Sequence, residues 1–384
     1  MPLLAAVCSP ALAQPIVPGA ELAIRRFEDL PGWLADDHAA AFRTFAKTCP
    51  ALAEGTQAIR GAQPAPDGLS AACLDALGLR DPGGEMARTF FERRFIPIEV
   101  QVPGGRGFLT GYYEPEFLGA LEPKAGFSAP VFARPDDLVT LEPGEVVPGV
   151  PAGATAARRT AAGLTAYPDR GAIEDGAIAR HTKPIAFLRD AVDVFIVQVQ
   201  GSARLKLPDG RTVRLAYAGR NGLPYTSVAR LLVQQLGVKP ADMTADVLTG
   251  WLRQNPADGR DLLRQNRSYV FFRIADELDP VDGPIGAAGV PVTAGRTLAV
   301  DRSLWSFGLP VWLEGELPDV AGGSRPLQRL TVAQDTGSAI TGPARGDLFY
   351  GSGDDAGREA GLLRGEIRFV VLWPKPDLVP ARVP

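Results

Sequence analysis

The chain of 384 residues is long enough for about two or three domains with full hydrophobic cores. Its 40 basic and 44 acidic residues give a net charge of −4 and form no block of like charges, which argues against a nucleic-acid partner. No uncharged apolar run reaches the roughly 18 residues that a membrane-spanning helix needs, so we predict no transmembrane span. Glycine and proline, 43 and 35 residues, make up about a fifth of the chain against roughly 12% in average proteins, which predicts many turns between short strands.

The first segment, Met1 to Gln14, has a short apolar core followed by Ala11-Leu12-Ala13, the small-x-small pattern of a signal-peptidase site. We predict a signal peptide over residues 1–13, although its positively charged start is missing from this sequence. Cys8 raises the alternative of a lipid-modified first residue. Cleavage after Ala13 is the preferred reading, because Val7 is bulkier than the residue that lipid processing prefers.

Cys49 and Cys73 form an even pair in a chain that has the pattern of an exported protein, which indicates one disulfide. It would join a helix expected over Trp33 to Lys47, with Leu34 among its apolar positions, to a helix that carries Cys73. Two buried thiols are the alternative if the chain is not exported. A further helix is predicted over Glu85 to Arg94.

From Ile98 to Val102 apolar residues alternate, and Gly107 to Pro115 then closes a strand that bears Tyr112 and Tyr113. Tyrosines at a strand end stack on sugar rings and bond sugar oxygens, or serve as ordinary packing residues. The following segment, from about Leu121 to Asp169, is rich in Pro, Gly and Ala and is predicted to be a loosely ordered connection.

The run from Asp193 to Ser202 is rich in β-branched residues and is predicted to be a strand. Gln198 and Gln200 would share one face of it. Two amides on one face suit N-acetyl or hydroxyl groups of a ligand, and a solvated face is the alternative.

Several further elements are predicted from turn and cap signals. They are a hairpin of Arg204–Leu207 with Arg211–Leu215, a helix capped by Thr226 or Ser227 and ended by Gly237, helices over Ala245–Gln254 and Gly259–Gln265, and a strand over Ser268–Arg273.

The last block contains short strands separated by Gly and Pro turns, which is typical of a small closed barrel. These strands are Leu298–Asp301, Val311–Glu314, Leu330–Gln334, Asp347–Tyr350 and Ile367–Trp373. Gly351 to Gly365 is predicted to be a glycine-rich loop that borders a site.

Three aspartates, Asp301, Asp335 and Asp347, lie at the edges of these strands. A carboxylate at the mouth of a sheet is held by rigid strands yet borders a cleft, which is a common setting for a general acid. Each aspartate alone is better explained as a turn or cap residue. Three of them in one small β unit favour a site.

The ordered set of motifs resembles the membrane-bound lytic murein transglycosylase A family, whose aspartate-rich barrel segment is called the 3D domain. The matching blocks run from about Arg88 to Trp373 in the family's order: Gly111-Tyr112-Tyr113-Glu114-Pro115, Val199-Gln200-Gly201-Ser202, Tyr217 to Tyr225, Gly283-Pro284-Ile285-Gly286, the Asp301 segment, and Asp335-Thr336-Gly337 through Asp347. The chain departs from the family at Ala203, where Gly is usual.

The resemblance implies a mainly β fold, with a double-psi β-barrel, a second β-rich domain inserted into it, and a few short α-helices. Residues 14–112 and 272–384 would form the catalytic barrel, and 113–271 the inserted domain. It also implies a peptidoglycan lytic exotransglycosylase, with exo against endo action left open. Such enzymes cleave the β-1,4 bond between N-acetylmuramic acid and N-acetylglucosamine and leave 1,6-anhydromuramoyl ends.

By position, Asp347 matches the catalytic aspartate of the family, and Asp335 and Asp301 match the other two. Because the C6 hydroxyl of the sugar is the nucleophile, one carboxyl can act first as acid and then as base, unlike the carboxylate pair of ordinary glycosidases. For this role we expect the pKa of Asp347 to be raised by apolar neighbours or by Asp335. Asp335 would tune that pKa or orient Asp347, and Asp301 would be mainly structural.

Substrate contacts are predicted from Thr110, Tyr112, Gln200 and Ser202. An inverting hydrolase of the same barrel type and a non-catalytic cell-wall-binding protein are the alternative functions. The hydrolase would leave reducing ends, and the binding protein would release no products.

The partners implied are peptidoglycan glycan strands, with cell-wall synthesis proteins as further candidates, for a monomer in the periplasm or at the outer membrane. We predict no cofactor. We also predict no metal site, because the only histidines, His38 and His181, lie far from the cysteines and lack ligand spacing.

Overall fold

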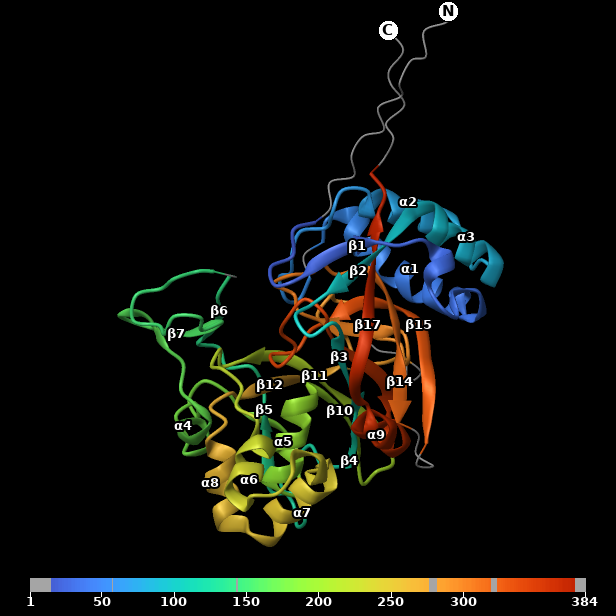
Figure 1. Ribbon diagram of the computed structural model, residues 1–384. Helices are drawn as coiled ribbons and strands as arrows, with labels where there is room; N and C mark the ends of the chain where they lie inside the picture. Colours follow the sequence, from blue (N-terminus) through green and yellow to red (C-terminus); the bar gives the residue numbers. More distant parts are fainter. Residues whose placement is uncertain (1–14, 57, 143, 276–281, 319–322, 377–384) are drawn as a thin grey trace, which may run out of the picture.

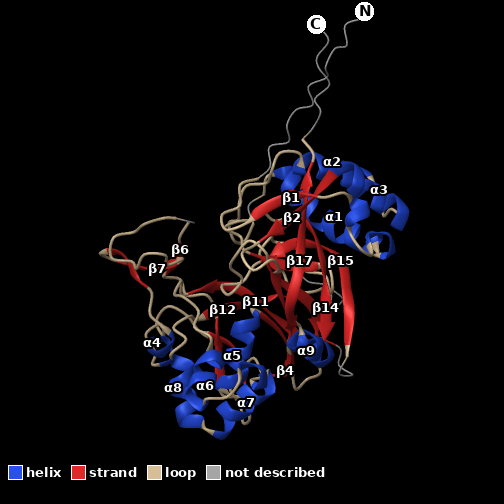
Figure 2. Ribbon diagram, viewed as in Figure 1, coloured by secondary structure: helices blue, strands red, loops and turns tan. Residues whose placement is uncertain are grey.

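The computed structural model describes residues 15–56, 58–142, 144–275, 282–318 and 323–376. The predicted signal peptide over residues 1–13 and the alternative lipid site at Cys8 lie outside these residues. Within the described ranges no helix is both long and apolar enough to cross a membrane. Helices gather at two ends of the molecule, with strands between them (Figure 2).

A closed ring of strands forms the upper body of the molecule (Figure 1). Its sheet comprises β1 (Glu21–Ile24), β2 (Phe95–Gln101), β3 (Gly107–Glu114), β13 (Thr297–Val300), β14 (Pro310–Pro318), β15 (Ser324–Asp335), β16 (Arg345–Ser352) and β17 (Arg364–Pro374). Among these described strands, six close on themselves in the order β17-β14-β15-β13-β16-β3, because β17 also pairs with β3. We call this ring the barrel; it is the double-psi β-barrel that was predicted.

Three helices cover one end of the barrel: α1 (His38–Glu54), α2 (Leu69–Gly78) and α3 (Gly84–Arg94). Their apolar faces share one hydrophobic core with the barrel strands. Gln334 on β15 fastens α1, since its amide donates to the carbonyl of Thr44 and to the hydroxyl of Thr48. A disulfide between Cys49 and Cys73 links α1 to α2.

The helix predicted over Trp33 to Lys47 is wrong at its start. Trp33–Ala35 forms a 3-10 turn, and α1 begins only at His38, where the Asp37 carboxylate caps it by accepting from Ala40 N. Leu34, predicted as an apolar packing position, is 75% exposed. The helix predicted over Glu85 to Arg94 is confirmed as α3.

A second β-rich body, which we call the insert unit, is formed by the part of the chain that follows β3 and precedes β13. It is drawn below the barrel in Figure 1. Its main sheet has the order β12-β11-β10-β4. The strands of the insert unit are β4 (Glu116–Leu118), β5 (Ala129–Phe132), β6 (Leu138–Thr140), β7 (Ala156–Thr160), β8 (Gly163–Ala166), β9 (Pro184–Leu188), β10 (Ser202–Lys206), β11 (Thr212–Arg220) and β12 (Val270–Ala275). The predicted hairpin is confirmed as β10 and β11. The prediction that the segment from about Leu121 to Asp169 is loosely ordered is wrong in part, because β5 to β8 lie within it.

The described part of the insert unit has five α-helices, of which the last four pack around an apolar cluster of their own and the first contributes Ile173 to another cluster. They are α4 (Arg170–Glu174), α5 (Ala191–Gln200), α6 (Val228–Leu236), α7 (Ala245–Gln254) and α8 (Pro256–Arg264). The predicted cap and stop of α6 are confirmed, since Ser227 Oγ accepts from Arg230 N and Gly237 ends the helix. Helix α7 has the predicted bounds, and α8 starts three residues before the predicted Gly259.

The strand predicted over Asp193 to Ser202 is wrong: most of that run is helix α5. Asp190 caps it by accepting from Asp193 N, and Gly201 ends it in the left-handed conformation at a φ of 83°. The helix packs against apolar neighbours on several sides, so Val192, Val194 and Val197 are buried side chains of a helix. Tertiary packing here overrides strand propensity.

The glycine-rich loop predicted over Gly351 to Gly365 is also wrong, because it folds as α9 (Gly353–Leu362). The helix packs closely on β3. A Cβ on Gly111 would meet the Cα of Ala360 at 2.8 Å, and a Cβ on Gly357 would meet the Tyr113 ring at 2.7 Å. Glycines that look like loop residues therefore serve a close helix-to-strand contact.

Candidate functional site

A cavity of about 320 Å³ lies where the barrel faces the insert unit. The barrel supplies residues of β3, β15 and β16, and the insert unit supplies residues of α5, β11 and β12. Thr110, Tyr112, Gln200, Asp335 and Asp347, all predicted site residues, line this one cavity. The structure thus brings together side chains from four separate parts of the sequence.

Asp347 reaches the cavity from the third position of β16. Parallel pairing with β3 sets it beside Thr110, and antiparallel pairing with β13 sets it beside Ala299. The Thr110 hydroxyl donates to Asp347 Oδ1 at 2.5 Å. The same hydroxyl oxygen accepts from Arg345 Nη2 at 2.7 Å, so Thr110 links the guanidinium to the carboxylate.

The pKa of Asp347 is raised from 3.8 to about 6. Burial is the largest cause, because a charged carboxylate loses hydration against the protein. The Thr110 hydrogen bond and the Arg345 charge act in the opposite direction, and the Asp335 charge adds to the rise. A large share of Asp347 therefore carries a proton near pH 6, as a general acid requires.

Asp335 ends β15, and backbone and side-chain donors hold its carboxylate. Oδ1 accepts from Ala287 N at 2.9 Å and from Thr336 N at 2.8 Å, while Oδ2 accepts from the Tyr112 hydroxyl at 2.8 Å. Burial raises its pKa, and these three donors oppose the rise. The donors fix the orientation of the Asp335 carboxylate in the same cavity as Asp347.

The charges of both Asp335 and Asp347 act on the hydroxyl of Tyr112. Burial and the charges of Asp335 and Asp347 raise its pKa well above the ordinary value, so it remains a neutral donor. Its ring lies 5.1 Å from that of Phe349, centroid to centroid, on the neighbouring strand. This contact fixes the ring while the hydroxyl reaches Asp335.

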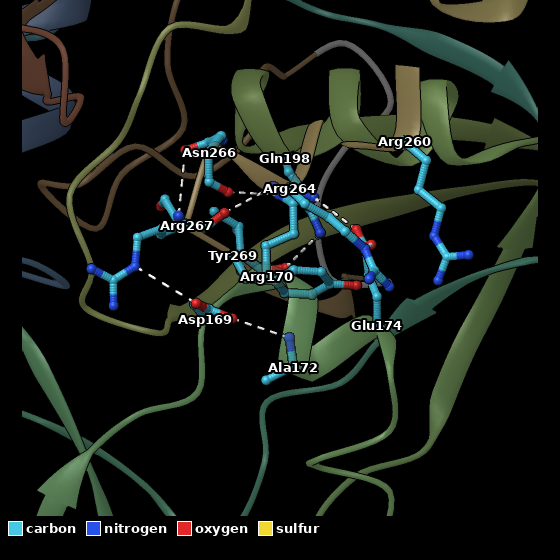
Figure 3. A network of polar contacts seen from close by, with 12 residues as sticks. Asp169, Arg170, Ala172, Glu174, Gln198, Arg260, Arg264, Asn266, Arg267 and Tyr269 are labelled. Carbon is cyan, nitrogen blue, oxygen red and sulfur yellow. Dashed lines mark hydrogen bonds and ion pairs between the residues drawn. The ribbon is translucent and has the colours of Figure 1, made fainter. Parts of the chain in front are cut away.

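The insert unit's side of the cavity is built around a buried arginine. Arg170 donates to Gln198 Oε1 at 2.6 Å and to the carbonyls of Asn266 and Ser268. Figure 3 shows it beside the ring of Tyr269, whose centroid lies 5.1 Å from the guanidinium carbon. These contacts hold the end of α5, where Gln200 faces the cavity and accepts from Tyr113 N at 3.3 Å.

Ion pairs between α4 and α8 hold this arginine in place. Arg170 lies 3.7 Å from Glu174, and Glu174 also pairs with Arg264 of α8 at 2.9 Å (Figure 3). Arg264 in turn pairs with Asp175. A chain of alternating charges therefore joins α4 to α8 and leaves the polar heads of Gln198 and Asn266 at the cavity.

Two predicted site residues do not line the cavity. Ser202 is buried at the start of β10, next to the lining residue Gly201. Asp301 holds a turn, since it accepts from the backbone and hydroxyl of Ser303 and from Gly342 N at 2.7 Å. The aspartates of the barrel thus occupy different environments.

Sequence reasoning missed the arginines of the site. Arg345 precedes Asp347 by two positions on one strand, so alternation places both on the same face, and this signal was present in the sequence. Arg60 and Arg220 also line the cavity, but they come from a loop and from the end of β11. No local pattern connects those two positions.

A possible metal-ligand group lies elsewhere in the described chain, where ligand atoms of Asp136, Asp137 and His181 lie within 4.8 Å of one another. The oxygens of Asp137 already accept from Arg158 at 2.7 Å and from the Tyr167 hydroxyl at 2.8 Å. His181 Nδ1 lies 2.9 Å from Asp136. Protein donors therefore already engage the oxygens of Asp137, and this group plays no part in the cavity.

Two known family models match separate parts of the chain. Residues 108–273 match the family model described as the MltA specific insert domain, and residues 296–373 match the 3D domain. The chain is 34% identical to membrane-bound lytic murein transglycosylase A of Vibrio cholerae over 199 residues, 50% of this chain and 52% of the relative. The matched region thus spans about half the length of the curated relatives.

Solved structures match over nearly the whole chain. A crystal structure of membrane-bound lytic murein transglycosylase from Agrobacterium tumefaciens is 36% identical, with a TM-score of 0.81, over 92% of this chain and 98% of that chain. MltA from Neisseria gonorrhoeae is 30% identical, with a TM-score of 0.77, over 97% and 98%. Escherichia coli MltA with bound chitohexaose is 25% identical, with a TM-score of 0.64, over 94% and 93%.

Proposed function

The chain belongs to the membrane-bound lytic murein transglycosylase A family, and on this premise we propose that it cleaves peptidoglycan. The bond broken is the β-1,4 link between N-acetylmuramic acid and N-acetylglucosamine, and the product carries a 1,6-anhydromuramoyl end. The observation that carries the proposal is the pKa of Asp347, raised to about 6 at the floor of a cavity wide enough for sugars. Chitohexaose in the Escherichia coli relative supports an oligosaccharide as ligand.

Asp347 acts first as a general acid. Its proton passes to the glycosidic oxygen while the bond from that oxygen to C1 of the muramoyl residue breaks, and N-acetylglucosamine leaves as an alcohol. The developing positive charge on the muramoyl ring lies in a cavity that also holds the carboxyl groups of Asp335 and Asp347. Each favours the oxocarbenium-like transition state when it is ionised.

Asp347 then acts as a base. The carboxylate takes the proton from the C6 hydroxyl while O6 forms a bond to C1, which closes the anhydro ring and returns Asp347 to its acid form. No water is consumed, so one carboxyl completes the cycle. Thr110 keeps Oδ1 in place through both steps, because its hydroxyl donates to that atom and is itself held by Arg345.

Asp335 tunes this cycle. Its negative charge favours the protonated form of Asp347, while three donors hold it in orientation. We assign substrate contacts to Thr110, Tyr112 and Gln200 on the cavity wall, and Ser202 stands next to that wall. Asp301 supports the barrel turn beside the site.

The catalytic barrel and inserted domain are proposed as 14–112 with 272–384 and as 113–271. The family matches over 108–273 and 296–373 support this division. We place the protein in the cell envelope, in the periplasm or at the outer membrane, because its curated relatives are named membrane-bound murein enzymes. Exolytic action on glycan strands, as a monomer, completes the proposal.

The deciding experiment incubates purified peptidoglycan with wild type, Asp347→Asn and the control Asp261→Asn, an exposed aspartate on α8 outside the cavity. Released muropeptides are identified by mass spectrometry, and circular dichroism verifies folding. We expect anhydromuramoyl products from wild type and Asp261→Asn, and at least about a hundredfold less from Asp347→Asn. Reducing-end products would show hydrolysis instead, and no products from folded wild type would indicate a wall-binding protein.

A further inference from the structure

Two arginines line the catalytic cavity, Arg60 from the loop after α1 and Arg220 from the end of β11, and a third, Arg302 after β13, lies near enough to Arg60 for the two charges to act on each other. Burial lowers the pKa of both Arg220 and Arg302, and the charge of Arg60 lowers each of them further. Like charges this close repel one another, and the repulsion grows as water is excluded. The cluster is therefore costly to the protein unless an anion enters it.

The hydrogen-bond acceptors of these guanidiniums are neutral, although the charge of Asp301 acts on Arg302 and the charge of Arg60 acts on Asp335. Among the residues that the structure describes, none of the three forms an ion pair with a carboxylate. Arg60 donates to the Thr336 carbonyl at 3.4 Å, while Arg220 and Arg302 each donate to a backbone carbonyl of a nearby loop.

One nitrogen of the cluster has no partner at all. Arg220 Nε is buried and lacks a hydrogen-bond acceptor within the described chain. A buried charged donor without an acceptor costs free energy, and a bound ligand oxygen removes that cost. Both Arg220 and Arg60 line the cavity that holds Asp347, so the free donor belongs to the substrate side of the fold.

The cluster is held in place before any ligand arrives. The guanidinium of Arg60 lies 4.1 Å from the ring centroid of Tyr217 on β11, a cation–π contact across the cavity end. Arg60 N donates to the Ala287 carbonyl at 3.2 Å, and Gln63 N donates to the Arg302 carbonyl at 3.0 Å. The loop that carries Arg60 is thus tied to the barrel, which preorganises the site.

Guanidinium groups recognise carboxylates well, because two parallel N–H donors match the two oxygens. The sugar rings of a glycan strand carry no charge. The muramoyl residue is the exception, since its O3 bears a lactyl group whose carboxyl is either free or extended by a peptide stem with carboxylates of its own. An anion-binding wall beside the acid therefore fits this substituent.

We propose that Arg60, Arg220 and Arg302 form a carboxylate-binding subsite for the anionic O3 substituent of a muramoyl residue in the cavity. This inference rests on the proposed function. The subsite orients the muramoyl residue relative to Asp347 and selects peptidoglycan over uncharged glycans such as chitin fragments. The carboxylate comes from the lactyl group or from the peptide stem, and the ligands used in the test separate these sources.

The test measures Kd by calorimetry in the Asp347→Asn background, where ligands are not turned over. The ligands are chitohexaose, a muramoyl oligosaccharide with free lactyl groups, and the same oligosaccharide with peptide stems. Arg60→Gln and Arg220→Gln are compared with Arg180→Gln, an exposed arginine outside the cavity. We expect both cluster variants to weaken a carboxylate-bearing ligand at least tenfold, while chitohexaose changes less than twofold.

Weakening of the peptide-bearing ligand alone identifies the stem, and weakening of the free-lactyl ligand alone identifies the lactyl group. Weakening of both shows that the subsite accepts either carboxylate. Added salt should weaken binding of the acidic ligand to the unsubstituted cluster and have little effect in the variants. Equal weakening for all three ligands, or unchanged binding of the acidic ligands, would overturn the subsite. Arg60 lies in a loop outside the helices and strands and is only partly buried, so Arg60→Gln keeps the test valid if Arg220→Gln does not fold.

Failure of the function is separable from failure of the subsite. If the protein with Asp347 intact releases no anhydromuramoyl product from peptidoglycan, the proposed function fails. If it does release that product while the arginine variants bind acidic ligands normally, only the subsite fails.

Discussion

Thr110 donates its hydroxyl to Asp347 across 2.5 Å, although the two residues are 237 positions apart in the chain. The parallel pairing of β3 with β16 places them side by side. A donor to a carboxylate favours its charged form, so Thr110 limits the rise in pKa that burial causes. The pair thereby sets the pH at which Asp347 changes from acid to base.

Replacing Thr110 should move that pH. In wild type, activity that needs protonated Asp347 is lost as pH rises through about 6. Thr110→Val removes the donor that lowers this pKa, so the alkaline limb of kcat/KM shifts upward by about one pH unit, the worth of one hydrogen bond. Thr110→Ser keeps the hydroxyl and serves as control. An unmoved limb in Thr110→Val would contradict the assignment of Asp347 as the acid.

Tyr112→Phe should act through Asp335. Loss of the hydroxyl removes one of the donors that lower the pKa of Asp335, so this pKa rises and less of the carboxyl is charged near neutral pH. The charge that favours protonated Asp347 then weakens. The alkaline limb of the rate profile shifts downward, and kcat/KM falls by about tenfold, equivalent to about 1.4 kcal/mol.

Tyr113→Phe is the matched control for this experiment, because Tyr113 packs against Gly357 and does not line the cavity. It should leave the pH profile unchanged. A Tyr112→Phe variant with a lower rate but the wild-type profile would assign the hydroxyl to substrate binding alone.

Asp347→Asn should stabilise the protein at neutral pH. The raised pKa means that the stability contributed by Asp347 is fully present below about pH 4 and is lost as pH rises through about 6. A shift of about two pKa units corresponds to about 3 kcal/mol. Asparagine carries no charge and avoids this loss.

Urea unfolding at pH 4 and pH 7.5 measures the effect. The free energy of unfolding of Asp347→Asn should exceed that of wild type by more at pH 7.5 than at pH 4. An equal difference at the two pH values would mean that burial does not raise this pKa.

Glu114→Gln should destabilise the junction between barrel and insert unit. Glu114 is fully buried and pairs with Arg204 and Arg214, each at 2.8 Å, and it accepts from Ser352 at 2.7 Å. Removing the charge leaves two partly or fully buried arginines without a carboxylate, which costs about 3–5 kcal/mol. Denaturant unfolding provides the measurement.

Glu116→Gln is the control, because its partner Lys206 is largely exposed and a pair screened by water contributes little to stability. Equal losses in the two glutamate variants would show that burial of the Glu114 cluster adds nothing to its strength.

Elements with local signals were predicted well from the sequence. The β10–β11 hairpin has its Pro208-Asp209-Gly210 turn, and α6 has its Ser227 cap and Gly237 stop. Helix α5 was mistaken for a strand because β-branched residues suit both a strand and a buried helix. The Asp190 cap and the Gly201 stop are local helix signals that the strand prediction did not use.

The site residues, too, were predictable only where the sequence carries a local signal. Asp335 and Asp347 were recognised from motifs, and the neighbouring Arg345 was within reach of strand alternation. Arg60 was not, because its contact with Tyr217 depends on how a loop after α1 crosses to the insert unit. Such a meeting is created by tertiary packing and leaves no periodic trace in the sequence.

Strand β17 completes the ring by setting Arg364 beside Thr110, on the side of β3 away from Asp347. The ribosome makes this strand after all of the other described elements. A chain still being synthesised or still unfolded contains Asp347 but lacks the enclosure that raises its pKa. The raised pKa that the proposed acid role of Asp347 needs is therefore a property of the folded barrel and is absent from the unfolded chain.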